Sequence, residues 1–408
     1  MDEDGIHKHQ GKVDLAFARV ERDEAVCTEN KQAIYGFSKT RLAKGSSRLR
    51  VVKCAYCLRF LARWLKKPFE EATKDELVNL VGELENKPYA EYTKYDFKVV
   101  LKMFYKWLKG GDEEFPVEIK WLKPRLKNTV HKLPEELLSE EDVLKIVQAA
   151  TNLRDKALVL TLYESGCRIG ELLSLKVKNV QFDQYGAILR VTGKTGDRRV
   201  RVITSAPALA VWLENYSAAK NPDAPLWPPL ATNQSHKTQA AEYPSIYVLV
   251  QRLARKAGIR KNVFPHLFRH SRATFLASKL TEAQMKEYFG WTQSSEMAAT
   301  YVHLSGRDVD NALLKLHHLT KEQQAEEPSV LELKPCLRCR ENNSPASKFC
   351  FKCGTPLDEK HVYQIEEERK VGDEIFNALM QNDEFKEFTL KKVVELGLGG
   401  KLLGDGRA

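Results

Sequence analysis

A histidine and an arginine three residues apart stand near the start of a predicted helix, in the run Phe264-Pro-His-Leu-Phe-Arg-His-Ser-Arg272. His266, Arg269 and His270 fall at i, i+3 and i+4, so a helix places them on one face. A guanidinium can bind two phosphate oxygens at once, and an imidazole gives or takes a proton near neutral pH. The run could therefore hold a phosphate and move a proton beside it, although a capped surface helix with ordinary basic residues fits the same letters.

Three further fragments carry groups of a similar kind. Arg168 stands at a predicted helix start with Glu171 three residues on, which could hold the guanidinium in place or pair with it at the surface. Lys194 lies in a glycine-flanked turn, from which an ammonium could reach a bound backbone and donate a proton. Trp291 follows a glycine, and Tyr301 comes ten residues later. Each fragment alone is weak, because single arginines and turn lysines are usually surface charges.

The order and spacing of the four fragments are more specific than any one of them. An arginine, a hairpin lysine, His-x-x-Arg, Gly-Trp and then a tyrosine form a pattern that resembles the tyrosine recombinases, also called the phage-integrase family. The resemblance covers about residues 135–320 as a catalytic domain and, more loosely, 28–110 as a core-binding domain. It implies site-specific cleavage and rejoining of duplex DNA through a 3′-phosphotyrosyl intermediate.

The resemblance also assigns roles to the phosphate-binding residues and the nucleophile. Arg168 and Arg269 resemble the two arginines that grip the scissile phosphate, and Tyr301 aligns with the attacking tyrosine. Such fixed guanidiniums neutralise the charge that develops on the phosphate without a metal, and electrostatic preorganisation is often the largest catalytic contribution. No nucleotide cofactor is implied, since the Gly-x-x-x-x-Gly-Lys-Ser/Thr motif is absent from the sequence.

The other residues that match the family pattern are candidates for proton transfer. Lys194 is the candidate acid for the departing 5′ oxygen, and His266 is the candidate base or hydrogen-bond partner for the phenol, whose pKa is ordinarily about 10. Trp291 occupies a position where the family has histidine or tryptophan, and it offers only an indole N–H donor. His270 is expected to be structural.

Two other functions remain open at this point. A type IB topoisomerase uses a related set of arginines, lysine, histidine and tyrosine to relax supercoils. A zinc-ribbon DNA-binding regulator could keep the scaffold without cleaving DNA. The presence of all five polar candidates argues against such a decayed enzyme, and the His-x-x-Arg-His helix with a short hairpin favours the integrase branch over the topoisomerase.

Four cysteines form two Cys-x-x-Cys pairs ten residues apart, which is typical of a zinc ribbon. A closed site of four thiolates suits a structural Zn²⁺, not a catalytic one; the alternative is a reduced, metal-free loop. The predicted ligands are Cys336, Cys339, Cys350 and Cys353. A third pair, Cys54 and Cys57, lies inside an amphipathic helical pattern and is expected to pack in a core.

Composition agrees with a DNA partner. The 408 residues include 65 Lys and Arg against 55 Asp and Glu, a net charge of +10. That charge suits a polyanionic partner, either nucleic acid or an anionic membrane surface, and alone it is weak evidence. No apolar run resembles a signal peptide or approaches the length of a membrane span, so the protein is expected to be cytoplasmic. The resemblance further implies four identical protomers acting on two DNA sites.

The chain length predicts two or three domains, and the periodicity predicts a mainly α fold with a small β-hairpin or sheet. Strands are expected at 187–191 and 199–203, and helices at 154–165, 266–279 and 282–289. The expected divisions are a flexible tail over 1–25, a helical core-binding domain over 26–112, a basic linker over 113–134, the catalytic domain over 135–320, a zinc ribbon over 334–357 and a helical tail over 360–408.

Overall fold

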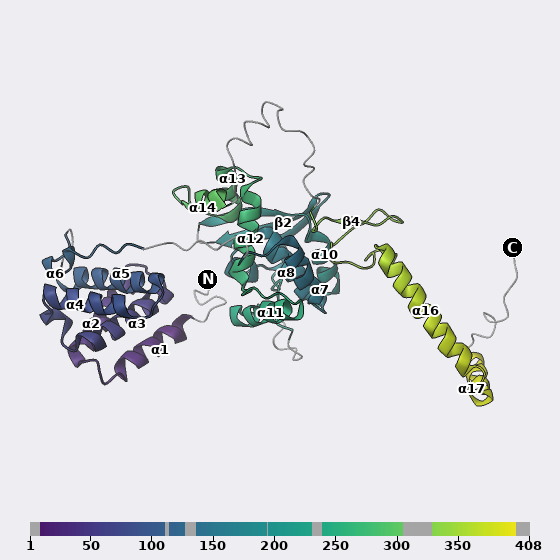
Figure 1. Ribbon diagram of the computed structural model, residues 1–408, viewed down its shortest axis with the longest axis horizontal. Coiled ribbons are helices and arrows are strands. Elements are labelled where there is room, and N and C mark those ends of the chain that lie inside the picture. Colours follow the sequence, from purple (N-terminus) through teal and green to yellow (C-terminus); the bar gives the residue numbers. More distant parts are fainter. Residues whose placement is uncertain are drawn as a thin grey trace, which may run out of the picture. The chain divides into compact units, whose positions relative to one another are not determined.

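The structure is a computed structural model that describes residues 9–110, 114–126, 136–193, 195–230, 239–304 and 329–396 (Figure 1). Contacts divide the chain into two compact units. The first comprises residues 1–134 with 241–243, and the second comprises residues 135–240 with 244–408. Most of the described secondary structure is helical and the sheets are small and antiparallel, which confirms the predicted fold class.

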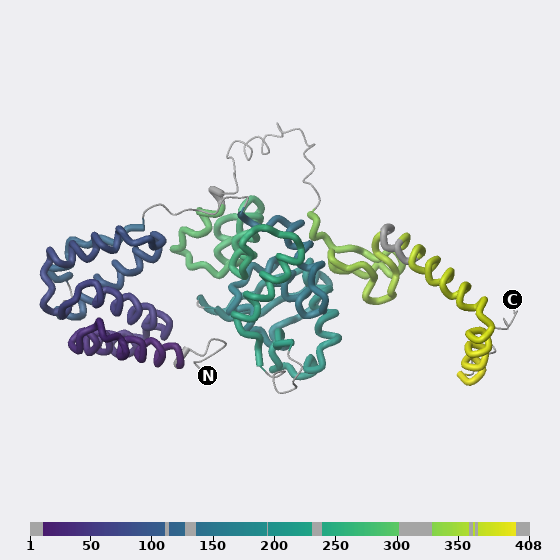
Figure 2. The backbone as a smooth tube through the Cα atoms, turned by 60° about the horizontal axis from the view of Figure 1, so that its bottom comes forward, coloured from purple at the N-terminus to yellow at the C-terminus, as the bar shows by residue number. Residues whose placement is uncertain are grey.

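The first unit is a helical bundle, drawn in purple to blue in Figure 2. Its core is rich in leucine and aromatic side chains, among which Phe37 and Phe69 both pack on Phe104. Cys54 and Cys57 are buried in this core as free thiols, as expected. The helices are α1 (His9–Glu21), α2 (Thr28–Ala43), α3 (Arg48–Leu65), α4 (Lys74–Asn86), α5 (Glu91–Leu108) and α6 (Val117–Lys120).

The start of the chain differs from the expected flexible tail. Residues His9–Glu21 form α1, which packs on α3 and buries Val13 and Val20. These valines are seven residues apart, with Ala16 and Phe17 between them partly buried, so a narrow apolar stripe exists among charged residues. The high charge of the segment hid that stripe from the sequence analysis.

The expected basic linker is also partly ordered. Its first half forms α6, and both Ile119 and Leu122 are buried in the core of the first unit. Prolines and lysines are frequent in this stretch, but Phe115 and Trp121 also pack against the core and help to attach it. Residues 127–135 lie outside the described part of the chain.

The second unit is built around α8, whose residues from Ala157 to Ser165 are all buried. Asn152 caps its start by accepting a hydrogen bond from the backbone N–H of Asp155, and Gly166 ends it with a φ of 56°. The helices around it are α7 (Glu140–Ala149), α8 (Leu153–Ser165), α9 (Ile169–Leu173), α10 (Ala206–Asn215), α11 (Tyr243–Lys256), α12 (Pro265–Ala277), α13 (Glu282–Phe289) and α14 (Met297–Leu304).

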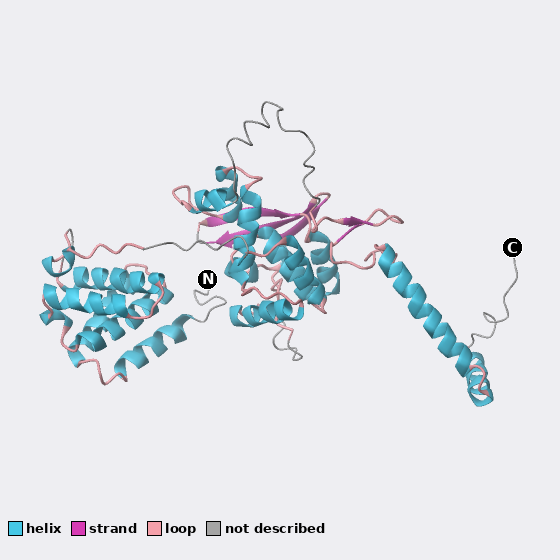
Figure 3. Cartoon of the chain, in the orientation of Figure 1, coloured by secondary structure: helices cyan, strands magenta, loops and turns pink. Residues whose placement is uncertain are grey.

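A three-stranded antiparallel sheet crosses this unit, drawn in magenta in Figure 3. The strands are β1 (Val180–Asp183), β2 (Gly186–Gly193) and β3 (Gly196–Val202), in the order β1-β2-β3. The hairpin β2–β3 confirms the prediction, and β3 contacts both α8 and α13. Strand β1 was not predicted, because its apolar alternation, Val-Gln-Phe-Asp, covers only four residues.

The buried carboxylate of Glu164 ties the end of β3 to α8. Its two oxygens accept hydrogen bonds from the backbone N–H groups of Ile203, Thr204 and Ser205 at 2.7, 2.8 and 2.7 Å, and from the Ser205 hydroxyl at 2.7 Å. Four donors thus depend on one side chain, and the bonds of two of them, both from Ser205, are buried. An unsatisfied buried donor costs about 1–3 kcal/mol.

We therefore expect Glu164→Gln to lower the free energy of unfolding by about 2–4 kcal/mol, since an amide presents N–H groups to donors. Urea denaturation followed by circular dichroism measures the change. Glu214→Gln, on the exposed side of α10, is the matched control. Equal urea midpoints for the two variants would contradict the anchoring role.

After α14 the described chain resumes at residue 329, with a small cysteine-rich module and two helices. Ser329 donates a 2.6 Å hydrogen bond to Glu140 on α7. Among the described residues no helix is long and apolar enough to cross a membrane. The elements are β4 (Lys334–Pro335), β5 (Asn342–Asn343), α16 (Glu359–Leu379) and α17 (Asp383–Glu395).

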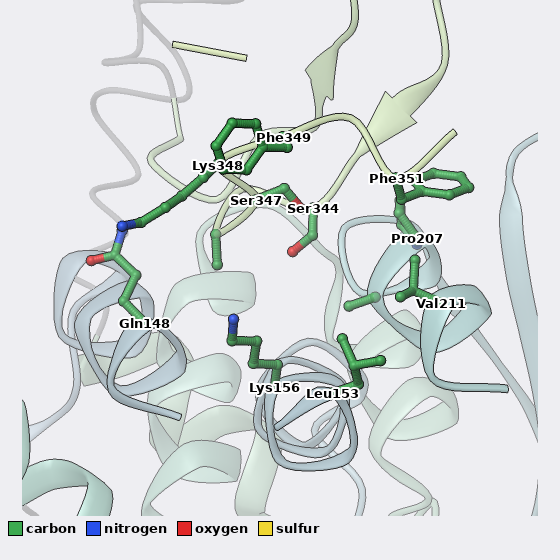
Figure 4. Close-up of a pocket in the computed structure, with 12 residues that line it drawn as sticks. Gln148, Leu153, Lys156, Pro207, Val211, Ser344, Ser347, Lys348, Phe349 and Phe351 are labelled. Atoms are coloured by element: carbon green, nitrogen blue, oxygen red, sulfur yellow. The ribbon is translucent and has the colours of Figure 1, made fainter. Parts of the chain in front are cut away.

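A groove of about 340 Å³ separates the cysteine-rich module from the helices beneath it. Figure 4 shows Phe349 and Phe351 of the module on one side of the groove, and Leu153 and Val211 on the other. Its lining is largely apolar, it lies among α7, α8 and α10, and none of Arg168, Arg269 and Tyr301 lines it.

Candidate active site

Arg168 is positioned by the break between two helices. Gly166 ends α8 in the left-handed conformation, and Arg168 is the residue that begins α9. Its Nη1 donates to Glu171 Oε1 at 2.8 Å, and its backbone N–H donates to Oε2 of the same carboxylate at 2.9 Å. The Arg168 side chain is 35% exposed, so it is held by Glu171 and still accessible to solvent.

Glu171 holds the guanidinium from inside the protein and is not a surface partner. It is only 7% exposed, and its second oxygen also accepts a 2.7 Å hydrogen bond from Arg198 Nη2 on β3. Burial opposes the charge of this carboxylate, but the hydrogen bond and charge of Arg198 and the hydrogen bonds from Arg168 outweigh it and lower the pKa of Glu171. The role of Arg198 was not predicted.

Arg269 lies on α12 and is 3% exposed. Its Nη1 donates to the carbonyl of Gly166 and its Nη2 to the carbonyl of Phe289, both at 2.7 Å. The guanidinium also lies 5.5 Å from the ring centre of Trp291. Burial, together with the nearby charge of Arg168, lowers the pKa of Arg269 to about 10, so it stays charged at neutral pH.

Tyr301 lies on α14 between an imidazole and an indole. Its ring stacks on Trp291 at 5.6 Å with an interplanar angle of 4°, and its hydroxyl contacts Nδ1 of His270. The side chain is 5% exposed. Burial raises the pKa of Tyr301 to about 12, although the charge of Arg269 works in the opposite direction. The phenol is therefore protonated at neutral pH and needs a partner to take its proton.

The histidine in contact with Tyr301 is thus His270, for which only a structural role is expected from the sequence. His266 lies one helical turn earlier on α12, with its ring edge-on to that of His270 at 4.6 Å between centres. Spacing alone could not separate the two imidazoles, because i and i+4 share a helix face. The position of α14 decides which histidine contacts Tyr301, and that position cannot be predicted from a local sequence pattern.

The C-terminal end of α13 is where the predicted residues converge. The carbonyl of Phe289 accepts from Arg269, the carbonyl of Gly290 lies 3.4 Å from Nη1 and Nη2 of Arg168, and Trp291 follows directly. Carbonyls at a helix C-terminus carry partial negative charge and attract cations. Lys194 lies outside the described residues; Gly193 and Gly196, on either side of it, pair at the end of the β2–β3 hairpin.

The four predicted metal ligands come together in the cysteine-rich module. All four sulfurs lie within 4.8 Å of one another, with Sγ–Sγ distances of 3.6 Å for Cys336 and Cys353 and 3.5 Å for Cys339 and Cys350. None of these cysteines forms a disulfide. A tetrahedral ion with metal–sulfur bonds of about 2.3 Å requires sulfurs about 3.8 Å apart, so the cluster fits a metal ion.

Comparison with known proteins identifies the family. Residues 136–307 match the sequence model of the phage integrase family. The chain is 30% identical over 228 residues to the tyrosine recombinase XerA of Pyrococcus horikoshii, an alignment that covers 54% of this chain and 74% of XerA. The chain belongs to the tyrosine recombinases. A second tyrosine recombinase, XerC of Xanthomonas campestris, is 25% identical over 210 residues, which cover 50% of this chain and 62% of XerC.

Solved structures of tyrosine recombinases share the fold. The XerH recombinase bound to its difH substrate aligns with a TM-score of 0.54 and 18% identity, over 78% of this chain and 91% of XerH. The Tn1549 integrase aligns with a TM-score of 0.55 and 16% identity, over 70% of this chain and 99% of the integrase. Tyrosine recombinases cleave and rejoin DNA at specific sites through a covalent tyrosine intermediate. The predicted family, enzyme class and activity are therefore confirmed.

Proposed function

We propose that Tyr301 is the nucleophile of this recombinase and that Arg168 and Arg269 grip the scissile phosphate. The Tyr301 oxygen attacks phosphorus, the bond to the 5′ oxygen breaks, and a 3′-phosphotyrosyl link forms while a 5′-hydroxyl leaves. A 5′-hydroxyl of another strand reverses the step. The supporting observation is that both guanidiniums and the Tyr301–Trp291 stack gather at residues 289–291.

Two protons must move during cleavage. His270, in contact with the Tyr301 hydroxyl, takes the phenolic proton, and His266 completes the imidazole pair beside the phosphate. Lys194 gives a proton to the departing 5′ oxygen. Trp291 supplies an indole N–H and, by stacking, fixes the plane of the tyrosine ring. No metal or nucleotide takes part in this scheme.

The proton-acceptor role predicts a pH-dependent defect for His270→Ala. Because the pKa of Tyr301 is about 12, its phenolate is scarce at pH 7 and grows tenfold with each pH unit. We expect the variant to cleave about 100-fold more slowly than wild type at pH 7. The ratio of the wild-type rate to the variant rate should fall toward pH 9. Rates of covalent adduct formation between pH 6.5 and 9 measure it.

His266→Ala is the matched comparison, since it removes an imidazole from the same helix face. If the ratio of wild-type to variant rate fell with rising pH for His266→Ala and stayed constant for His270→Ala, the two assignments would be reversed. Equal, pH-independent losses in both variants would remove the base role from both histidines.

We also propose that the substrate is double-stranded DNA and that four protomers act on two sites. Structures of lambda integrase, which share the fold, are described as a dimer bound to a core site and as a tetramer bound to a Holliday junction. The net charge of +10 fits a DNA partner, and binding is expected to weaken steeply with salt. The enzyme acts inside the cell, where its DNA lies.

We propose that the metal held by the four cysteines is Zn²⁺ and that its role is structural. We expect one zinc per chain by elemental analysis, and none in Cys350→Ser, because a structural site is closed by all four thiolates. Cys27→Ser, which removes a free cysteine of the first unit, is the control and keeps its zinc. Zinc-free wild-type protein, purified without chelator, would contradict the assignment.

Covalent trapping tests the function. Wild-type protein is incubated with sheared genomic DNA, denatured, and the protein-linked fragments are sequenced. If the enzyme is a site-specific recombinase, the linked fragments share a common sequence. A plasmid that carries two copies of that sequence should then yield recombined products. Relaxation of plasmids that lack the site would favour the topoisomerase, whereas failure to link to any DNA would favour a non-catalytic binding protein.

A further inference from the structure

We propose that Arg198 is a positioning residue for cleavage. It fixes the positions of the two phosphate-binding arginines, because it holds Glu171 and the C-terminal end of α13. This inference rests on the proposed roles of Arg168 and Arg269. Arg198 lies on β3 with its side chain only 8% exposed. On that strand it faces inward with Val200 and Val202, whereas Arg199 and Arg201 face outward.

The Arg198 guanidinium bridges three separate elements. Its Nη2 donates to Glu171 Oε2 on α9 at 2.7 Å and lies 3.6 Å from the sulfur of Cys167, and its Nε donates to the carbonyl of Tyr288 on α13 at 3.2 Å. Burial works against its charge, yet the hydrogen bond and charge of Glu171 raise the pKa of Arg198. The residue is therefore a fixed cation beside the site.

Three consecutive carbonyls of α13 and its cap are each met by a different arginine. Tyr288 O accepts from Arg198, Phe289 O accepts from Arg269 at 2.7 Å, and Gly290 O lies 3.4 Å from both terminal nitrogens of Arg168. Two of these arginines are the proposed phosphate ligands. A shift of the Tyr288 carbonyl would move the adjoining acceptors of both.

Two glycines leave the space that Arg198 and Glu171 occupy. A Cβ on Gly290 would lie 2.8 Å from Arg198 Nη1, and a Cβ on Gly193 would lie 2.6 Å from Glu171 Oε1. Gly290 also has a φ of 60°, which side-chain-bearing residues rarely adopt. The hairpin that carries Lys194 and the turn that carries Trp291 thus close directly around this ion pair.

The shared carboxylate also adjusts the charge available to the phosphate. Glu171 divides its oxygens between Arg168 and Arg198, so neither guanidinium is fully neutralised by it. Without Arg198, the whole carboxylate charge would fall on Arg168 and draw it away from a bound phosphate. Arg198 therefore acts through Glu171 and the α13 carbonyls, without contact with DNA.

The test compares Arg198→Gln, Arg198→Lys, Glu171→Gln and the double variant Arg198→Gln/Glu171→Gln on the trapped DNA site. We expect Arg198→Gln to slow single-turnover cleavage at saturating DNA about 10- to 100-fold, the scale of a small misplacement of reacting groups. DNA affinity should change less than about threefold, because no phosphate contact is lost, and Arg198→Lys should recover part of the rate.

Arg201→Gln is the matched control, since Arg201 lies on the same strand but pairs at the surface with Asp183. We expect the double variant to be no slower than Arg198→Gln alone, because the two residues act as one unit. Losses that multiply in the double variant, or wild-type cleavage by Arg198→Gln, would overturn the inference. If Arg198→Gln fails to fold, the same comparison made with Arg198→Lys decides. Absence of cleavage by wild type would instead refute the proposed function.

Discussion

Tyr301→Phe is expected to abolish the covalent protein–DNA adduct, with a fall in cleavage rate of at least about 10⁴-fold, the scale seen when an enzyme loses its nucleophile. Phenylalanine keeps the ring that stacks on Trp291 but has no oxygen to attack phosphorus. A water molecule that replaced the phenol would not be held in line with the phosphorus atom. Its attack would hydrolyse the strand and leave no phosphotyrosyl link for rejoining. A denaturing gel with end-labelled DNA measures the adduct directly.

Tyr185→Phe, on the exposed turn between β1 and β2, is the control for loss of a tyrosine hydroxyl and should cleave like wild type. DNA affinity of Tyr301→Phe should be unchanged, because the phenol is 5% exposed and packs within the protein. A Tyr301→Phe protein that still links to DNA would show that another residue is the nucleophile.

Arg269→Lys is expected to reduce cleavage by a factor on the order of 10² to 10³, the usual loss for one preorganised donor at a developing charge. The positive charge is kept, but a single ammonium cannot reproduce the planar fork that reaches the carbonyls of Gly166 and Phe289 together. The rate is measured in single turnover at saturating DNA, so that binding does not enter.

Arg255→Lys, at the exposed end of α11, makes the same chemical change away from the site and should leave the cleavage rate unaltered. Arg269→Lys should retain its fold, which thermal unfolding checks. A folded Arg269→Lys protein with wild-type cleavage would mean that Arg269 supports the helix junction and does not stabilise the transition state.

Much of the site could be predicted because it is encoded in local features. Gly166 ends α8 and so leaves Arg168 at a helix start. Pro265 begins α12 and puts His266 and Arg269 on its first turns. The Thr281 capping box starts α13, whose end brings Gly290 to the site. Each of these signals lies within a few residues of the group it positions.

The features that could not be predicted depend on contacts between distant segments. His270 contacts Tyr301 across 31 residues, and Arg198 reaches Tyr288 across 90. An arginine on a strand is expected to be a solvated surface charge unless a buried partner for it is known. For Arg198 that partner is Glu171, which lies on another element. The same limit applies to α1, whose few apolar residues matter only because α3 lies beside them.

The burial of α8 from Ala157 to Ser165 has a mechanical consequence. At about 1.5 Å per residue its 13 residues span about 20 Å, from the Arg154 side chain, which donates to Pro228 O at 2.6 Å, to the Gly166 carbonyl that holds Arg269. A tilt of about 5° about its first turn would move the far end by roughly 1.7 Å, beyond the displacement of about 1 Å that can cost 100-fold in rate. Substitutions at Arg154 should therefore slow cleavage from a full helix length away, because a helix that is buried from Ala157 to Ser165 transmits a rotation of its first turn to its far end.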